Sequence, residues 1–335
     1  MDEPLKPRWS DEATLDDIYY CYRLLLGREP GEEGWKFWSQ RLASEQFTYS
    51  KLAAYFCKSR EYATSARARG IKRVALDGFD LYVYEYDWDV GEQIVQTKQY
   101  EPHVTSFLKQ HLKEGSTFVD VGANIGYFTL VAATQIGTSG RTIAVECNPK
   151  NCELLYMSLH RNGLDNVLVY PFAISDAEKL MSFSCGFSNG FVDELGEDDN
   201  EAVIVPAVTL DFLLRNEPRV DMIKMDVEGS EGKAWRGMKQ VVEKHHPVIL
   251  MEFFPALLEK YSATRGDELL DDIFAQGYTA TILQPVDGGF ARASSPAEVI
   301  EEWKKKSEAS GDDSREYLDL AFQTEKENSL PTAIT

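Results

Sequence analysis

The acidic side chains at the ends of predicted strands are the residues whose types and spacing best suit chemistry. Asp226 and Glu252 each end an apolar segment, 220–225 and 247–251, and Glu228 follows two residues after Asp226. Parallel strands end at one edge of a sheet, so we expect these carboxylates to converge there. A carboxylate at such a site takes a proton from a hydroxyl or orients it. We predict Asp226 as general base or orienting group, with Glu228 and Glu252 as further catalytic residues.

Other roles stay open for the same side chains. If the strand persists beyond Asp226, Glu228 shares its pleat direction. Carboxylates at neighbouring strand ends raise the pKa of one among them, or hold a divalent cation through oxygen ligands, although a metal is not our prediction. A plainer alternative is that Asp226 and Glu228 cap the following helix and bind a ligand's amino group. Among the five histidines, only His103 is a candidate base, and a structural role is favoured for it.

A glycine turn between a strand and a helix predicts where a ligand binds. Residues 117–121 are short, β-branched and apolar, and residues 127–133 continue with helical spacing. Gly122 and Gly126 bracket the three residues between these segments. Such a turn lets the backbone approach a ligand closely at the carboxyl edge of a sheet. A strand, turn and helix without a ligand is the alternative.

The ligand that suits this turn is a cation without phosphate. A dinucleotide turn needs G-x-G-x-x-G, but Asn124 and Tyr127 occupy the second and third glycine positions after Gly122. Asp120, just before the turn, would repel a diphosphate and attract a cation. S-adenosylmethionine carries an amino group and a sulfonium and no phosphate. We therefore predict S-adenosylmethionine as cofactor, bound at Asp120, Gly122, Asn124 and Gly126, and disfavour a nicotinamide oxidoreductase.

The next strand and helix extend the predicted cofactor site. Residues 141–146 read as a strand that ends in Glu146, where paired hydrogen bonds hold a ribose diol. Asn148 opens the following helix, and Ala173 lies near the end of a third strand, 166–176. We include Glu146, Asn148, Ala173 and also Asp226 among the cofactor-binding residues.

Strands that alternate with helical stretches predict the fold class. The segments 220–226, 246–254, 278–283 and 317–323 continue the strand series, and helical patterns separate them. This order predicts an α/β fold with a doubly wound, seven-stranded, mostly parallel Rossmann-like sheet. We expect Asp77-Gly78 to turn a hairpin that covers one edge of this domain. Within the polar stretch 183–200, the acidic run 193–201 is expected to be a solvated loop, with Ser188 and Asn189 nearby as acceptor contacts or a lid.

The motifs of this sheet, taken together, resemble the FkbM family of methyltransferases. The resemblance covers roughly residues 76–323 and rests on FVDVGANIG at 118–126, ExNP at 146–149, TLD at 209–211, IKMDVEGSE at 223–231 and the lead-in YEP at 100–102. It implies S-adenosylmethionine-dependent O-methylation of a hydroxyl on a sugar, glycan or polyketide-like natural product. It also implies that Glu101 holds the methionine end of the cofactor, although a glutamate favoured by the helix dipole is nearly as good a reading.

The amino-terminal residues predict a separate helical unit. We divide the chain into a helical module at 1–68, a hairpin and linker at 69–95, and a methyltransferase domain at 96–335. The sequence YRLLLGREP at 22–30, followed by Gly34-Trp35, resembles a small module of unknown function that is similar to phycobilisome linker repeats. This resemblance implies a role in docking to a protein or glycan.

Composition narrows the function classes. The net charge of −20, spread along the chain, argues against binding of nucleic acid. No apolar stretch is long enough for a membrane span, and the charged amino terminus is not typical of a signal peptide. Five cysteines without a C-x-x-C pair indicate reduced thiols and a cytoplasmic protein. Two alternatives to O-methylation stay open: methylation of nitrogen or a carboxylate, and a non-catalytic scaffold on a methyltransferase fold.

Overall fold

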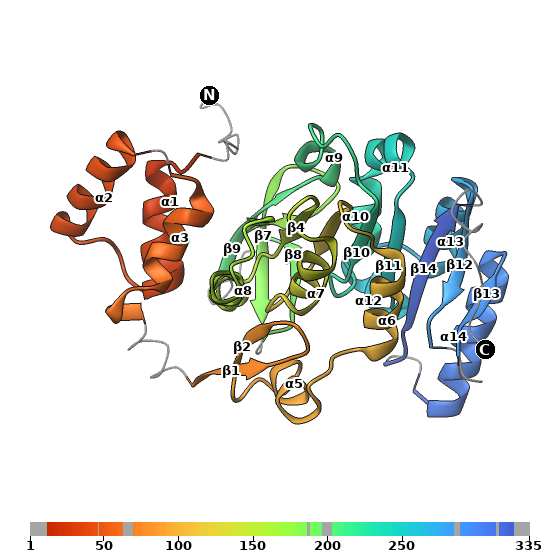
Figure 1. Ribbon diagram of the computed structural model, residues 1–335. Coiled ribbons are helices and arrows are strands. Elements are labelled where there is room, and N and C mark those ends of the chain that lie inside the picture. The colour runs from red at the N-terminus through yellow and green to blue at the C-terminus, as the bar shows by residue number, and fades with distance from the viewer. Residues whose placement is uncertain are drawn as a thin grey trace.

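The computed structural model describes residues 12–45, 47–62, 70–185, 188–195, 203–284, 289–312 and 315–324. Along the chain it forms a group of short helices, a hairpin and an α/β body (Figure 1). Within the described residues, no helix has the length and apolarity that crossing a membrane requires.

The body is built on one large sheet, which confirms the predicted fold class. Its strands lie in the order β13-β12-β14-β11-β10-β3-β4-β5. Neighbours from β11 to β5 pair in parallel, and β14, β12 and β13 pair antiparallel at the other end. The sheet has eight strands rather than seven, because the short β13 pairs with β12. The bounds are β3 Thr117–Val121, β4 Arg141–Val145, β5 Val167–Tyr170, β10 Met222–Met225, β11 Val248–Phe253, β12 Tyr278–Ile282, β13 Ala291–Ala293 and β14 Leu318–Thr324.

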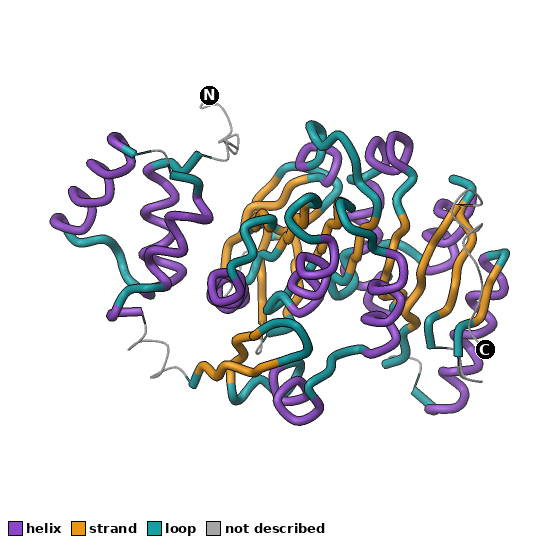
Figure 2. The backbone as a smooth tube through the Cα atoms, viewed as in Figure 1, coloured by secondary structure: helices purple, strands orange, loops and turns teal. Residues whose placement is uncertain are grey.

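Helices cover both faces of this sheet, as Figure 2 shows. Alternate residues of each strand point to opposite faces, so Phe118 joins one apolar core and Val119 the other. The first core includes α6 Pro102–His111, α7 Tyr127–Ile136 and α8 Pro149–Asn162. The second includes residues of α9 Leu210–Leu213, α10 Glu231–Arg236, α11 Lys239–His245, α12 Pro255–Ser262, α13 Gly266–Ala275 and α14 Pro296–Ser310.

A second sheet corrects one expectation and adds strands that the sequence did not predict. The predicted third strand splits into β5 and β6, and the two belong to different sheets. The second sheet has four strands in the order β6-β9-β7-β8. Of the expected loop 193–201, Asp193 and Glu194 belong to β8, and 196–201 lies outside the described residues. Met181 and Val205 are buried whereas the residues before them, Leu180 and Ile204, are exposed, which is the two-residue period of a strand. The bounds are β6 Ala173–Ile174, β7 Lys179–Cys185, β8 Gly190–Glu194 and β9 Val203–Val208.

The predicted hairpin is present and lies against helix α8. β1 Ile71–Ala75 and β2 Asp80–Tyr84 pair antiparallel around the Asp77-Gly78 turn. β2 lies along α8, where the Tyr82 amide donates to Ser158 Oγ at 3.0 Å. α5 Gly91–Thr97 then leads to α6.

The amino-terminal helices pack on the body through α8. They are α1 Leu15–Tyr20, the π-helical η1 Cys21–Leu25, α2 Glu32–Ser44 and α3 Tyr49–Cys57. Thr48 caps α3, since its side chain accepts from the Lys51 amide, as the sequence predicts. η1 and α3 both contact α8, and Leu52 and Phe56 of α3 belong to the same apolar core as α8.

Candidate active site

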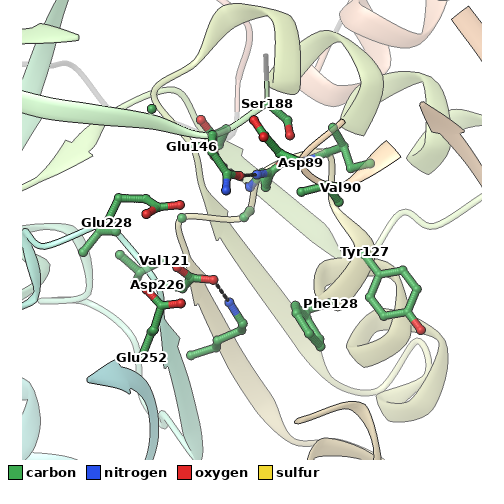
Figure 3. Close-up of a pocket in the computed structure, with 18 of the residues that line it drawn as sticks. Asp89, Val90, Val121, Tyr127, Phe128, Glu146, Ser188, Asp226, Glu228 and Glu252 are labelled. Carbon is green, nitrogen blue, oxygen red and sulfur yellow. Dashed lines mark hydrogen bonds and ion pairs between the residues drawn. The ribbon is translucent and has the colours of Figure 1, made fainter. Parts of the chain in front are cut away.

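A cavity of about 550 Å³ opens at the carboxyl ends of β3, β4, β10 and β11. Its size is in the range of small-molecule sites. Figure 3 shows Asp226, Glu228 and Glu252 on one side of it and Glu146 and Ser188 on another. Of the eleven residues predicted for catalysis or cofactor binding, eight line this cavity: Glu101, Gly122, Asn124, Glu146, Ala173, Asp226, Glu228 and Glu252. Gly126 does not line it, although its neighbours Ile125 and Tyr127 do.

The glycine turn forms the floor of the cavity. Gly122 has a φ of +77°, and a Cβ there would lie 1.8 Å from the backbone oxygen of Asp226. Gly126 has a φ of +94°, and its Cβ would lie 2.3 Å from Leu155 Cδ1. A side chain at Gly122 would therefore strike the backbone that follows β10. The turn keeps open the approach to the cavity that the sequence predicts.

Glu146 is held at the end of β4 by two backbone amides. Its Oε2 accepts from the Asn124 amide at 2.7 Å, and its Oε1 accepts from the Asn148 amide at 2.6 Å. The side chain is buried but lines the cavity. Burial raises the pKa of Glu146 to about 7, against the lowering effect of both amides. The two amides fix the carboxylate in a position from which its remaining lone pairs can accept hydrogen bonds from a diol.

Two predicted cofactor residues act behind the cavity wall instead of lining it. Asp120 is fully buried, and its Oδ2 accepts from the Thr129 hydroxyl at 2.6 Å. Asn148 uses its Oδ1 to accept from the Lys150 amide at 3.0 Å, which caps α8. Neither side chain lines the cavity, so each supports the turn or Glu146 from behind, and cofactor binding by either stays a prediction.

Asp226 and Glu228 reach the cavity differently from the prediction. β10 ends at Met225, and Glu228 has a φ of +52°, so the two do not share a strand pleat. Both side chains nevertheless line the cavity, and so does Glu252 near the end of β11. Neither Asp226 nor Glu228 caps α10, whose N-cap residue is Ser230. Burial, followed by repulsion from Asp226, raises the pKa of Glu228 to about 8 and that of Glu252 well above its ordinary value.

Lys224 is the residue that sequence reasoning missed. It is 5% exposed, lines the cavity, and its Nζ lies 2.9 Å from Asp226 Oδ2 and 4.7 Å from the centre of the Phe128 ring. Burial lowers its pKa, but attraction to Asp226, Glu101 and Asp120 outweighs this and raises the pKa overall. The sequence did hold a signal for it, namely a lysine inside an otherwise apolar strand. Burial of an unpaired ammonium is costly, so such a lysine predicts a carboxylate partner nearby.

Glu101 enters the same cluster from the start of α6. It is the N-cap residue of this helix, with a left-handed φ of +38°, and it lines the cavity. Burial raises its pKa to about 7, although Lys224 lowers it. Asn124, with a φ of +51°, and Glu228 are also left-handed residues of the cavity wall. Such backbone is uncommon outside glycine and gathers at functional sites.

His103 faces the cavity next to this cluster and is paired with a carboxylate. Its Nε2 lies 2.6 Å from Asp319 Oδ2 on β14. Asp319 is in register with Glu252 on the neighbouring strand. The sequence singled out His103, but nothing in it indicated Asp319 as the partner, because 216 positions separate the two.

The opposite wall comes from the second sheet and the segment before it. Ala173 lines the cavity, and so do Ser188 and Asn189. Asn189 Oδ1 accepts from Asn124 Nδ2 at 2.8 Å, and the Ser188 hydroxyl donates to Asp87 Oδ1 at 3.0 Å. These bonds connect the glycine turn to residues well beyond it in the chain.

The charged residues around the cavity suit an organic cation better than a diphosphate. Within the described residues, no group of three or more His, Cys, Asp and Glu side chains is arranged to hold a metal. The cationic lining residues are Lys224, which Asp226 engages, His103, which Asp319 engages, and Arg315, which pairs with Asp312. A diphosphate would find carboxylates around it and no unengaged cation among these.

Comparison with known proteins finds a family model that matches the central part of the chain. Residues 120–280, just under half of the chain, match the sequence model of the methyltransferase FkbM domain. The ribosomal protein L11 methyltransferase of Thermotoga maritima is 33% identical over 72 residues, which are 22% of this chain and 26% of that protein. The chain spans 19% to 40% of the length of the curated relatives it matches.

Solved methyltransferase structures are similar at low identity. The FkbM methyltransferase from Methylobacillus flagellatus KT is 16% identical with a TM-score of 0.39, covering 90% of this chain and 58% of that one. An O-methyltransferase from Bacillus cereus in complex with SAH is 17% identical with a TM-score of 0.40, covering 69% of this chain and 88% of that one.

Proposed function

Since residues 120–280 match the sequence model of the methyltransferase FkbM domain, we propose that this chain is an S-adenosylmethionine-dependent O-methyltransferase. Its acceptor is a hydroxyl on a sugar, glycan or glycosylated natural product. The observation that carries the proposal is the combination of Glu146 with the glycine turn in one cavity that offers carboxylates and no unengaged cation for phosphate.

The chain's own residues fit each part of the cofactor. Glu146 is placed to accept from a ribose diol, and Gly122 leaves room for the ligand against the turn. Glu101, Asp226 and the neighbouring carboxylates suit the amino group and the sulfonium. When bound, the cofactor supplies an electrophilic methyl group.

Asp226 is the first candidate for the acceptor's proton. Its Oδ2 is held by Lys224, which leaves Oδ1 to receive a hydroxyl proton or to orient the hydroxyl. The ammonium fixes the carboxylate in place, and orientation of the nucleophile contributes much of the rate in a displacement. His103 is the second candidate, because Asp319 engages Nε2 and so leaves Nδ1 as the proton acceptor.

Two other functions remain as alternatives. A methyltransferase that acts on nitrogen or on a carboxylate would use the same cofactor site. A scaffold would need neither the turn nor Glu146, so the preserved geometry of both favours an enzyme.

Calorimetry distinguishes these functions. We expect S-adenosylmethionine and S-adenosylhomocysteine to bind, and NAD⁺ not to bind. A panel of sugars and glycans with a labelled methyl donor then tests the acceptor. Failure of both adenosyl compounds to bind would favour the scaffold. Transfer of the labelled methyl group to an amine or a carboxylate, and not to a hydroxyl, would favour a methyltransferase that acts on nitrogen or on a carboxylate.

The amino-terminal helices fit a docking module, within the proposed division at 1–68, 69–95 and 96–335. α2 has no buried residue although it carries Trp35, Phe37 and Trp38. Arg41 lies over the rings of Phe37, Trp38, Phe47 and Tyr55 at 4.9 to 5.7 Å from their centres. Phe37 and Tyr55 of this group are exposed, at 53% and 39%, whereas Trp35 and Trp38 are partly buried against the core. The two exposed rings suit contact with a protein or glycan partner.

A further inference from the structure

Carboxylates outnumber cations around the end of β10. Asp226 is neutralised by Lys224 at 2.9 Å. The side chains of Glu101, Glu228 and Glu252 line the same cavity and make no hydrogen bond or ion pair with other described residues. Three carboxyl groups therefore share a partly buried space without a counterion of their own.

Two of these groups, Glu101 at the start of α6 and Glu252 on β11, come from separate elements and meet beside the end of β10. A second, small cavity of about 10 Å³ is lined by Glu101, Lys224, Asp226, Glu252 and Asp319 together. That volume is about the size of one water molecule. The titratable and charged groups that face the carboxyls are Tyr100, His103, Asp120, Lys224, Asp226, Glu231, Tyr317 and Asp319, with Asp89 and Arg315 at the cavity wall.

Crowding and burial keep protons on this cluster near neutral pH. Burial is the largest cause in each case, and it raises the pKa of Glu101 to about 7 and that of Glu228 to about 8. The pKa of Glu252 is raised well above its ordinary value, first by burial and then by Asp226 and Glu228. A nearby positive charge reverses part of this effect, because it favours the ionised carboxylate.

The substrate and product forms of the proposed cofactor differ by one positive charge. S-adenosylmethionine carries a sulfonium, whereas S-adenosylhomocysteine has a neutral thioether at the same position. The adenosine, amino and carboxylate groups are common to both and cancel in a comparison. Any difference in the number of protons released on binding of the two ligands therefore comes from protein groups that respond to the charge on the sulfur.

We propose that Glu101, Glu228 and Glu252 exchange protons for the positive charge of the methyl donor. The three carboxyls lose protons to solvent when S-adenosylmethionine binds and regain them when the product form occupies the cavity. This exchange rests on the proposed function and adds selection of substrate over product to it. Binding of the methyl donor gains from rising pH, while binding of the product does not.

Isothermal titration in two buffers of different ionisation enthalpy measures the exchange directly. At pH 7.5 we expect S-adenosylmethionine to release about half a proton to one proton more than S-adenosylhomocysteine. Glu252→Gln and Glu228→Gln should each reduce this excess. Glu114→Gln, an exposed residue outside the cavity, is the matched control and should leave it unchanged.

A second measurement uses only the native chain, so it does not depend on the folding of a variant. The ratio of the Kd of S-adenosylhomocysteine to that of S-adenosylmethionine should rise about ten- to a hundredfold between pH 6 and pH 8. Equal proton release with a constant ratio would overturn the exchange and leave the proposed function standing. If neither Glu252→Gln nor Glu228→Gln reduced the additional proton release by S-adenosylmethionine, the proposed proton exchange would also be overturned. Failure of both ligands to bind would overturn the exchange and the proposed function together.

Discussion

At the scale of single residues, Glu146 joins local backbone structure to ligand binding. Each carboxylate oxygen already accepts one amide, from Asn124 in the glycine turn and from Asn148 at the start of α8. The side chain therefore cannot turn away from the cavity without leaving two buried donors unpaired. Any ligand that binds its outer lone pairs meets a carboxylate that is already oriented.

Replacing Glu146 tests this arrangement. Glu146→Gln puts an NH₂ group against one of the two amide donors and removes the charge. We expect binding of S-adenosylhomocysteine to weaken about 10- to 100-fold, which corresponds to roughly 1.5–3 kcal/mol for a hydrogen bond to a charged group. Calorimetry measures this, with Glu114→Gln as control. Affinity within a factor of two of the native chain would remove Glu146 from the binding site.

Asp226 is tested by separating turnover from binding. Asp226→Asn keeps the size of the side chain and an oxygen for Lys224 but cannot take a proton. We expect turnover on the acceptor found in the panel to fall about 10²- to 10⁴-fold, with little change in affinity for S-adenosylhomocysteine. Asp165→Asn, at an exposed position, serves as control. Undiminished turnover would exclude Asp226 and favour the His103–Asp319 pair.

The residues found from sequence were those that follow a local rule. Glu146 and Asp226 stand at the ends of predicted strands, where topology alone predicts function. Lys224 lies within a strand, and only a contact with Asp226 explains its burial. Asp319 lies on β14, and its bond to His103 depends on how the whole sheet is assembled. Asp120 also lies near the end of a predicted strand, but its side chain is buried and accepts a hydrogen bond from the Thr129 hydroxyl.

At the scale of elements, the turn after β3 depends on the absence of a side chain at Gly122. Gly122→Ala would place its Cβ against the Asp226 carbonyl and would hold alanine at a φ of +77°. Gly163→Ala, at the end of α8, has a φ of +64° but meets nothing within 4 Å. It therefore isolates the cost of left-handed backbone, about 1–2 kcal/mol.

Urea denaturation compares the two glycine variants. We expect Gly122→Ala to lose at least about 3 kcal/mol of unfolding free energy, which is the range of severe backbone conflicts. Gly163→Ala should lose only the smaller amount. Equal losses in the two variants would show that the contact with Asp226 carries no special cost.

Helices and strands could be predicted from the sequence where the spacing of apolar residues stayed regular over the whole element. The five parallel strands and the antiparallel final pair follow from apolar segments with clear ends. The third strand was read as one because residues 171–172 are not distinguishable from strand by pattern alone. The second sheet was not predicted, because the glycine, serine and acidic residues around β7 and β8 give a composition typical of loops, although Phe183 and Val192 are buried there.

At the scale of the whole molecule, buried carboxyls make stability depend on pH. Glu231 is fully buried, its Oε1 accepts from the Val227 amide at 2.9 Å, and burial raises its pKa to about 7 from an ordinary 4.5. The folded chain therefore holds this proton more tightly than the unfolded chain. The resulting stability is complete below pH 4.5 and is lost as the pH rises through 7.

Glu231→Gln should remove this dependence. The amide keeps an oxygen for Val227 and never ionises. We expect native chain and variant to be equally stable near pH 5, and the variant to be more stable by on the order of 2 kcal/mol at pH 8. Urea midpoints at both pH values, with Glu114→Gln as control, measure the difference. A variant that is less stable than the native chain at pH 8 would show that the charged form is favoured in the fold.

The central claim is that the cavity at the glycine turn holds S-adenosylmethionine through Glu146. A crystal structure with S-adenosylhomocysteine tests it most directly. We predict electron density for the ribose hydroxyls within hydrogen-bonding distance of the Glu146 carboxylate and for the adenosine beside the turn at 122–126. Ligand density elsewhere on the chain, or a ribose turned away from Glu146, would contradict the claim.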